Sequence, residues 1–133
     1  MTRMTETSII RSFTQSDFDC FARLSGDENP IHVDSEFSAR TRFGRPVAHG
    51  LLLCSVLRAL IEDIVPGGHL HEQCVMFPAP TFAGEPMRFF VQIVGDGERD
   101  SRQAFHCEME VKRLADELVT CQGTASVRCS TLG

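Results

Sequence analysis

The apolar residues of this chain change their spacing near residue 66, and that change limits the folds available to it. Residues 50–65 are apolar on most sides of a helix, with one narrow polar stripe. Beyond Pro66-Gly67-Gly68, apolar and polar residues alternate, as in strands with one buried face. Both patterns need a partner surface to bury against. The sequence therefore predicts an α+β fold, with a curved antiparallel sheet wrapped around a long central helix.

The alternating half of the chain divides into four expected strands. In the last one, Cys121 and Ala125 fall on the apolar face, whereas Thr120 and Thr124 fall on the solvent face. Breaks at residues 78–84, 95–99 and 115–116 separate the strands, as in an antiparallel meander. The four strands are expected at residues 71–77, 87–94, 105–112 and 119–129.

The N-terminal half carries clear signals for a helix start and stop. Thr14 and Asp17 have the spacing of a capping box, and Gly26 is suited to end the helix in a left-handed conformation. A turn follows, and Asp34 or Ser35 is expected to cap a second, short helix. The remaining expected elements are a strand at residues 8–13 and the end of the short helix at Arg40.

Length, composition and charge exclude several classes of protein. The 133 residues are 42% hydrophobic and include ten Phe, which suffices for one domain, residues 1–133, with a sizeable core. The net charge of −5 argues against nucleic-acid partners and against anionic membrane surfaces. No apolar run is long enough to span a bilayer, and the first ten residues lack a signal-peptide core, so we expect a cytoplasmic protein.

The six cysteines contain no Cys-x-x-Cys pair. Without an export signal, a disulfide framework is not expected. Most of them occupy positions where a small apolar residue would serve, so we expect mainly reduced core thiols. A metal-ligating or nucleophilic role is the alternative.

Polar groups of catalytic type gather between residues 24 and 34. Asp27 and His32 flank Asn29-Pro30, and the proline stiffens the segment by fixing its own φ and extending the residue before it. A carboxylate and an imidazole held at a fixed separation suit the activation of water at neutral pH. The alternative is an ordinary Asx turn followed by a structural histidine.

A second candidate group lies where the long helix begins. Gly50 is expected close to the N-terminus of that helix, where unpaired backbone N–H groups and the helix dipole favour negative charge. Because glycine has no side chain, a ligand carbonyl can approach the backbone there and be polarised. The alternative is that Gly50 only permits tight helix packing.

Two segments together, SGDENPIHVD at residues 25–34 and FGRPVAHGLL at residues 43–52, resemble the MaoC-like (R)-specific enoyl-CoA hydratases, which have the hot-dog fold. The resemblance implies that Asp27 and His32 activate the water that adds to a trans-2-enoyl thioester. It further implies that the Gly50 N–H binds the thioester oxygen and that Asn29 orients the loop or the water. No metal or redox cofactor is implied, since coenzyme A is part of the substrate, and a homodimer is expected.

The expected function is therefore hydration of trans-2-enoyl-CoA to (R)-3-hydroxyacyl-CoA, or the reverse dehydration. Charged Arg58 on the apolar helix is expected to line or restrict the acyl tunnel. Acyl-CoA hydrolysis and a non-catalytic acyl-binding subunit are the alternatives. A third alternative is a metal-binding sensor whose ligands would be His69, His71 and Cys74. Contact with the phosphates of coenzyme A is a further expectation, and the residues expected to make it are Arg40, Arg42 and Arg45.

Overall fold

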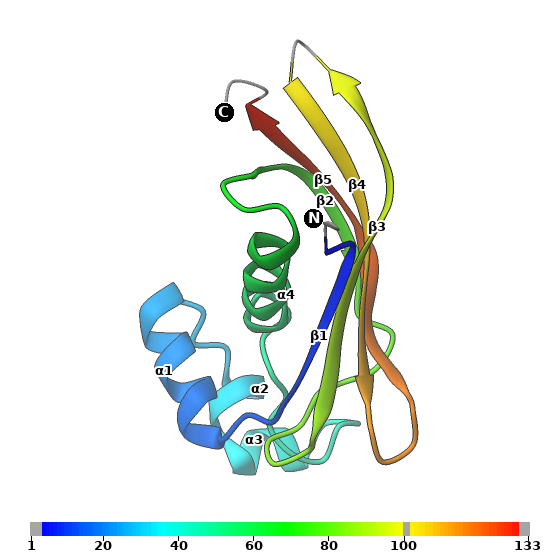
Figure 1. Ribbon diagram of the computed structural model, residues 1–133. Helices are drawn as coiled ribbons and strands as arrows, with labels where there is room; N and C mark the ends of the chain where they lie inside the picture. The colour runs from blue at the N-terminus through cyan, green and yellow to red at the C-terminus, as the bar shows by residue number, and fades with distance from the viewer. Residues whose placement is uncertain (1–3, 100–101, 131–133) are drawn as a thin grey trace.

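A computed structural model describes residues 4–99 and 102–130, and its central feature is an antiparallel sheet curved around one helix, α4 (Gly50–Ile64). Figure 1 shows the sheet on one side of α4 and α1 on the other, with α2 and α3 below the N-terminal end of α4. The strand order in the sheet is β1-β3-β4-β5-β2. The strands are β1 (Glu6–Arg11), β2 (His69–Met76), β3 (Met87–Arg99), β4 (Arg102–Arg113) and β5 (Val119–Ser130).

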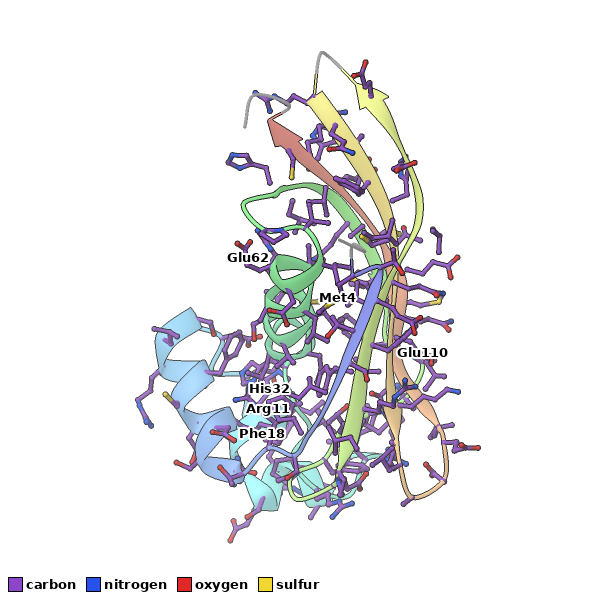
Figure 2. All side chains as sticks on the ribbon, viewed as in Figure 1. Met4, Arg11, Phe18, His32, Glu62 and Glu110 are labelled. Carbon is purple, nitrogen blue, oxygen red and sulfur yellow. The ribbon has the colours of Figure 1, made fainter. Side chains whose placement is uncertain are left out.

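The core lies between α4 and the concave face of the sheet. Seven residues of α4 are buried, and alternate residues of β3, β4 and β5 meet them, including Phe89 and Phe105. Side chains on the other face of the sheet point to solvent, as Glu110 does in Figure 2. The expected architecture of a curved sheet around a central helix is therefore confirmed.

Three short helices form a layer beside the N-terminal end of α4 (Figure 1). They are α1 (Gln15–Ser25), α2 (Pro30–Val33) and α3 (Ser35–Ala39). The expected start and stop signals of α1 are confirmed: Thr14 and Asp17 form a capping box, and Gly26 ends the helix with φ 82°.

Several expected boundaries were wrong. The first strand begins two residues earlier than predicted and ends at Arg11, so Phe13 lies beyond it and packs into the core. β2 likewise begins two residues early, and β3 continues to Arg99 through a segment predicted to be a break. The turn was expected around residues 27–30, and no helix was expected before residue 34. Residues 30–33 instead form α2, because Asn29 accepts from the Ile31 N–H and Pro30 takes the first helical position.

One irregularity in β5 reverses the direction of a side chain. Val111 pairs with Cys121 whereas Lys112 pairs with Val119, so Thr120 is an extra residue in a β-bulge. Thr120 and Cys121 are consequently both fully buried, although they are neighbours in one strand. The prediction of a solvent-facing Thr120 was therefore wrong, since simple alternation stops at the bulge.

The cysteines are all free thiols, and their burial only partly follows the expectation. Cys54, Cys107 and Cys121 are buried, Cys129 is half-buried, and Cys20 and Cys74 are exposed. Burial raises the pKa of the Cys107 thiol. Within residues 4–99 and 102–130, none of the helices has the length and apolar character that crossing a membrane demands.

Candidate active site

Asp27 and His32 lie together at the junction of α1, α2 and α4. Asp27 follows Gly26, which turns the chain at the end of α1, and His32 belongs to the single turn of α2. The Asp27 Oδ2 and His32 Nε2 atoms are 3.8 Å apart, and the two side chains are 55% and 14% exposed, respectively. Figure 2 shows His32 beside the N-terminal end of α4. The two side chains predicted as a pair are thus close enough for one water beside them to contact both.

The ring of His32 is held in one tautomer. Its Nδ1 lies 2.8 Å from the Val47 carbonyl oxygen. A carbonyl oxygen can only accept, so Nδ1 carries a proton, and in the neutral ring Nε2 presents a lone pair toward Asp27. The Gln15 side chain also donates to the His32 carbonyl at 2.9 Å, which ties α2 to α1. In this tautomer, Nε2 is ready to accept a hydrogen bond.

Polar contacts hold α2 in place, since none of its residues is buried. The Ser38 hydroxyl and the Val47 N–H both donate to the Ile31 carbonyl, each at 3.1 Å. The Asn29 side chain caps the start of α2 by accepting from the Ile31 N–H at 3.1 Å. These bonds connect the segment to α3 and to the strand-like stretch before α4.

His49 is a residue of this site to which the sequence analysis gave no role. It is 2% exposed, and its Nε2–H donates to the Asp27 backbone carbonyl at 2.9 Å. Its ring stacks on that of His32 with centroids 3.8 Å apart, and Phe21 contacts it edge-on. Burial lowers the pKa of His49, a shift opposed by its bond to the Asp27 carbonyl. The buried, neutral His49 therefore contacts both residues of the pair, through its bond to the Asp27 carbonyl and its stacking on the His32 ring.

The side chains of Asp27, His32 and His49 offer ligand atoms that lie within 4.8 Å of one another, and this is the one metal-compatible cluster among the described residues. The two imidazole rings are stacked at an interplanar angle of 22°, so their in-plane lone pairs run side by side and do not converge on one ion. The arrangement suits acid–base chemistry better than metal ligation. The alternative ligand set on β2, His69, His71 and Cys74, forms no such cluster.

Gly50 is the first residue of α4, as expected. The residue before it, His49, makes no side-chain capping bond, so the first amide groups of the helix have no cap from it. A methyl group at Gly50 would lie 2.6 Å from the Phe77 ring. Close packing against Phe77 is therefore a reason for a glycine at this position. The anion-binding potential of the helix start and the close contact with Phe77 therefore coexist at this position.

A pocket of about 570 Å³ opens beside the start of α4, and we call it the α4 pocket. Asp27 and His32 do not line it; the Val47–Gly50 segment separates them from it, because Val47 bonds His32 and also lines the pocket. A larger hollow, of about 680 Å³, lies on the outer face of the sheet and contains none of these residues. The α4 pocket is lined mainly by apolar residues, among them Val47, Ala48, Leu53, Phe77, Pro80 and Phe82, and also by Arg42, Gly50, Thr81 and Thr120.

The three arginines of the predicted phosphate contact have different surroundings. Arg42 lines the α4 pocket and is exposed. Arg45 forms an ion pair with Glu85 and lies over the Phe82 ring, with its Cζ 4.1 Å from the ring centroid. Arg40 is exposed at the end of α3. The structure therefore places Arg42, and not the other two, along the pocket wall.

Arg58 is not among the residues that line the α4 pocket. Its guanidinium donates to the Gly68 carbonyl at 2.9 Å and lies 3.7 Å from the Glu62 carboxylate. Arg58 thus ties the C-terminal half of α4 to the loop that follows it.

Comparison with known proteins relates both the sequence and the structure to acyl-thioester enzymes. Residues 2–116 match the family model described as the MaoC like domain. An (R)-specific enoyl-CoA hydratase of Aeromonas caviae is 36% identical over 85 residues, which cover 62% of this chain and 63% of that enzyme. A 3-hydroxybutyryl-CoA dehydratase of Methylorubrum extorquens is 35% identical over 85 residues, covering 62% of this chain and 54% of that protein. The matches thus span less than two thirds of either relative.

Solved structures give a fuller overlap. The (R)-hydratase of A. caviae aligns with a TM-score of 0.83 and 26% identity over 96% of each chain. An unliganded R-hydratase of Pseudomonas aeruginosa aligns with a TM-score of 0.83 and 23% identity, over 98% of this chain and 83% of that one; this second likeness concerns the fold alone. Together they confirm the expected hot-dog fold.

Proposed function

Since the chain belongs to the family of MaoC-like domains, we propose that it adds water to trans-2-enoyl-CoA to give (R)-3-hydroxyacyl-CoA, or removes water in the reverse direction. Relatives at about 35% identity are named as such hydratases and dehydratases. The observation that carries the proposal is the geometry of Asp27 and His32, whose facing acceptor atoms are 3.8 Å apart. That spacing suits one water hydrogen-bonded to both side chains.

The reaction mechanism follows from the hydrogen bonds that these two side chains accept from water. Water between them donates one hydrogen to the Asp27 carboxylate and the other to His32 Nε2, so its oxygen lone pairs are free. The oxygen bonds to Cβ of the enoyl group as Asp27 takes one proton. That proton then passes to Cα, so OH and H have been added across the double bond. Asn29 caps α2 and so orients the loop between the two groups.

Negative charge gathers on the thioester oxygen while the enolate exists. We place this oxygen at the N-terminus of α4, where the Gly50 amide and the helix dipole stabilise it. Access requires the Phe77 ring to move from the face of Gly50, and its 46% exposure allows that movement. Arg42 on the pocket wall is the arginine best placed to meet a coenzyme A phosphate.

The proposal includes one catalytic domain, residues 1–133, acting as a homodimer in the cytoplasm. The dimer is supported by the strand order, in which β1 and β2 are edge strands among the described residues. Exposed apolar side chains gather where β2 ends near the start of α4, namely Met76, Phe77 and Leu51. Light scattering of the purified protein is expected to give twice the chain mass.

A chain-length series of trans-2-enoyl-CoA thioesters tests the proposal. We expect loss of the conjugated enoyl absorbance and formation of the R product. Asp27→Asn removes the proton acceptor and is expected to lower kcat/KM by about 100- to 10,000-fold, and His32→Ala is expected to act in the same direction. Asp63→Asn, an exposed change on α4, is the matched control and is expected to leave the rate unchanged.

The products separate the alternatives. Release of free coenzyme A without hydration would identify a thioesterase. Binding of acyl-CoA with no turnover of any thioester, including acyl carrier protein thioesters, would identify a non-catalytic acyl-binding subunit. Unchanged activity in Asp27→Asn, with the fold intact by circular dichroism, would contradict the assigned role of the pair.

A further inference from the structure

The peptide group between Val47 and Ala48 makes two hydrogen bonds that point in opposite directions. Its carbonyl oxygen accepts from His32 Nδ1 at 2.8 Å, and its N–H donates to the Thr81 carbonyl, also at 2.8 Å. Val47 also forms an isolated antiparallel bridge with Phe82, the residue after Thr81. A peptide group is planar and trans, so its C=O and N–H turn together. Whatever holds Thr81 therefore also fixes the direction of the carbonyl that binds His32.

Two arginines hold the loop of residues 77–86, which joins β2 to β3. The Cζ atom of Arg45 is 4.1 Å from the centroid of the Phe82 ring, and that of Arg113 is 5.7 Å from it. Both distances are within the range of cation–π contacts. Arg113 also donates to the Pro80 carbonyl at 2.7 Å. The arginines therefore contact both the ring and the backbone of this loop.

Glu85 is the carboxylate that both arginines share. It forms one ion pair with Arg45 and another with Arg113, and its side chain is 20% exposed. Arg113 is 13% exposed and pairs also with Asp116, at 3.1 Å. Two guanidinium groups directed at one ring repel each other unless an anion lies beside them. Glu85 therefore allows both cations to stay in contact with Phe82.

We propose that Glu85 is a positioning residue for the hydration reaction, because its ion pairs hold the 77–86 loop where Thr81 orients the peptide group that binds His32. This inference rests on the proposed function. The bond from His32 Nδ1 decides which ring nitrogen carries the proton, and hence whether Nε2 can accept from water. A displaced carbonyl would leave the ring divided between two tautomers, one of which cannot accept at Nε2. The alternative is an ion-pair network that only stabilises the loop.

Glu85→Gln removes the charge and keeps the shape of the side chain. For a trans-2-enoyl-CoA thioester, we expect kcat to fall about fivefold or more with KM within about twofold, because a reacting group is misplaced while binding is unchanged. We also expect the ring nitrogen resonances of His32 in NMR spectra to change from one tautomer to a mixture of two. A network that only stabilised the loop would lower the thermal midpoint without this change in the ring.

Glu62→Gln is the matched control. Glu62 also pairs with an arginine, Arg58, and also holds a loop, since its carboxylate accepts from the Gly67 N–H at 2.9 Å. Figure 2 shows Glu62 and His32 toward opposite ends of α4. This variant should retain kcat and the single tautomer of His32, even if its thermal midpoint falls as far as that of Glu85→Gln.

Arg45→Ala tests the same route from the other side of the ion pair. The Arg45 side chain is 55% exposed, so this variant carries the test if Glu85→Gln does not fold. It should lower kcat and mix the His32 tautomers in the same way. The double variant should be no slower than the slower single variant, because both changes act through one loop. Losses that multiply in the double variant would overturn this common route.

The outcomes separate this inference from the proposed function. An unchanged kcat in Glu85→Gln, whatever its thermal midpoint, would overturn the positioning role and leave the hydratase standing. A lower kcat with the His32 tautomer unchanged would overturn the route through the Val47 carbonyl. If the wild-type protein turns over no thioester, the proposed function fails, and the nitrogen resonances of His32 decide the positioning role alone. A single tautomer in both Glu85→Gln and Arg45→Ala would then overturn it.

Discussion

The helix α4 and the Asp27–His49 stretch illustrate two different ways of fixing a side chain. Seven residues of α4 are buried in a shared apolar core, so each position there is supported by many neighbours. By contrast, α2 buries no residue, and α3 buries only Ser38. Individual hydrogen bonds to backbone carbonyls hold that stretch, such as those from His32 to Val47 and from His49 to Asp27.

This difference predicts that stability and catalysis depend on separate sets of residues. Apolar burial contributes free energy without direction, whereas a hydrogen bond fixes a particular atom in a particular place. Changes in the core should therefore unfold the protein, and changes in the Asp27–His49 stretch should leave it folded and misplace the reacting groups.

The largest expected effect is on stability and comes from the core. Phe89 is fully buried and packs edge-on against Phe13, with ring centroids 6.0 Å apart. Phe89→Ala should lower the free energy of unfolding by about 3–5 kcal/mol in urea titrations, through lost burial and the cavity left behind. Phe90→Ala, the next residue on the opposite face of β3, should cost less than about 1 kcal/mol. Equal losses in the two variants would contradict the assignment of the core.

A smaller effect, on catalysis, is expected at His49. A Gln side chain can place its amide N–H near the position of His49 Nε2 and keep the bond to the Asp27 carbonyl, whereas the shorter Asn cannot. His49→Asn should therefore lower kcat by about tenfold or more, as expected for a misplaced catalytic group, and His49→Gln should retain most of it. Similar rates in the two amide variants would show that His49 acts through packing alone.

The same residue gives the stability a pH dependence. Burial lowers the pKa of His49 in the folded protein, with the charge of a protonated His32 adding to the shift and Asp27 opposing it. Above about pH 6.5, His49 is neutral in both folded and unfolded chains; below it, the unfolded chain binds the proton first. The free energy of unfolding should thus fall as the pH drops from about 7 to 5.5, and less steeply in His49→Gln. An equal slope would contradict a buried neutral histidine.

The smallest expected effect is at the contact between α3 and α2. The Ser38 hydroxyl donates to the Ile31 carbonyl, which also accepts from the Val47 N–H. Ser38→Ala should cost about 1 kcal/mol in urea titrations and a few-fold in kcat, because the second bond remains. Ser16→Ala, on the exposed surface of α1, is the control for both measurements. A tenfold loss of activity would show that this contact, and not the Val47 bond, carries the position of α2.

The sequence predicted the elements that local signals define. The capping box at Thr14 and the left-handed Gly26 set the ends of α1 through their nearest neighbours, so the helix could be read directly. Asn29-Pro30 carried an equally local signal for the start of α2, namely an N-cap residue followed by proline. The sequence analysis interpreted this segment as a turn and did not predict the helix.

Features that depend on distant partners could not be predicted in this way. The inward Thr120 arises from the register between β5 and β4, and that register depends on residues 111 and 112 of the other strand. Likewise, His49 was visible only as part of a motif, because its partners Asp27 and His32 lie 22 and 17 residues away in the chain. The roles given to Asp27 and His32 remain predictions that the variants above test, and the role given to Gly50 also remains a prediction.

The order of the strands bears on how the chain emerges from the ribosome. The apolar helix α4 is complete by Ile64, but the strands β3, β4 and β5 that cover it come from residues 87–130, and β2 finds its partner only when β5 exists. A nascent chain therefore carries an uncovered apolar helix and an unpaired strand until β5 has been synthesised. Such long-range strand pairing forms slowly, and apolar surface that is prone to aggregation stays exposed until it is complete. We expect chaperone availability and translation speed, more than the strength of the final core, to limit the yield of folded protein.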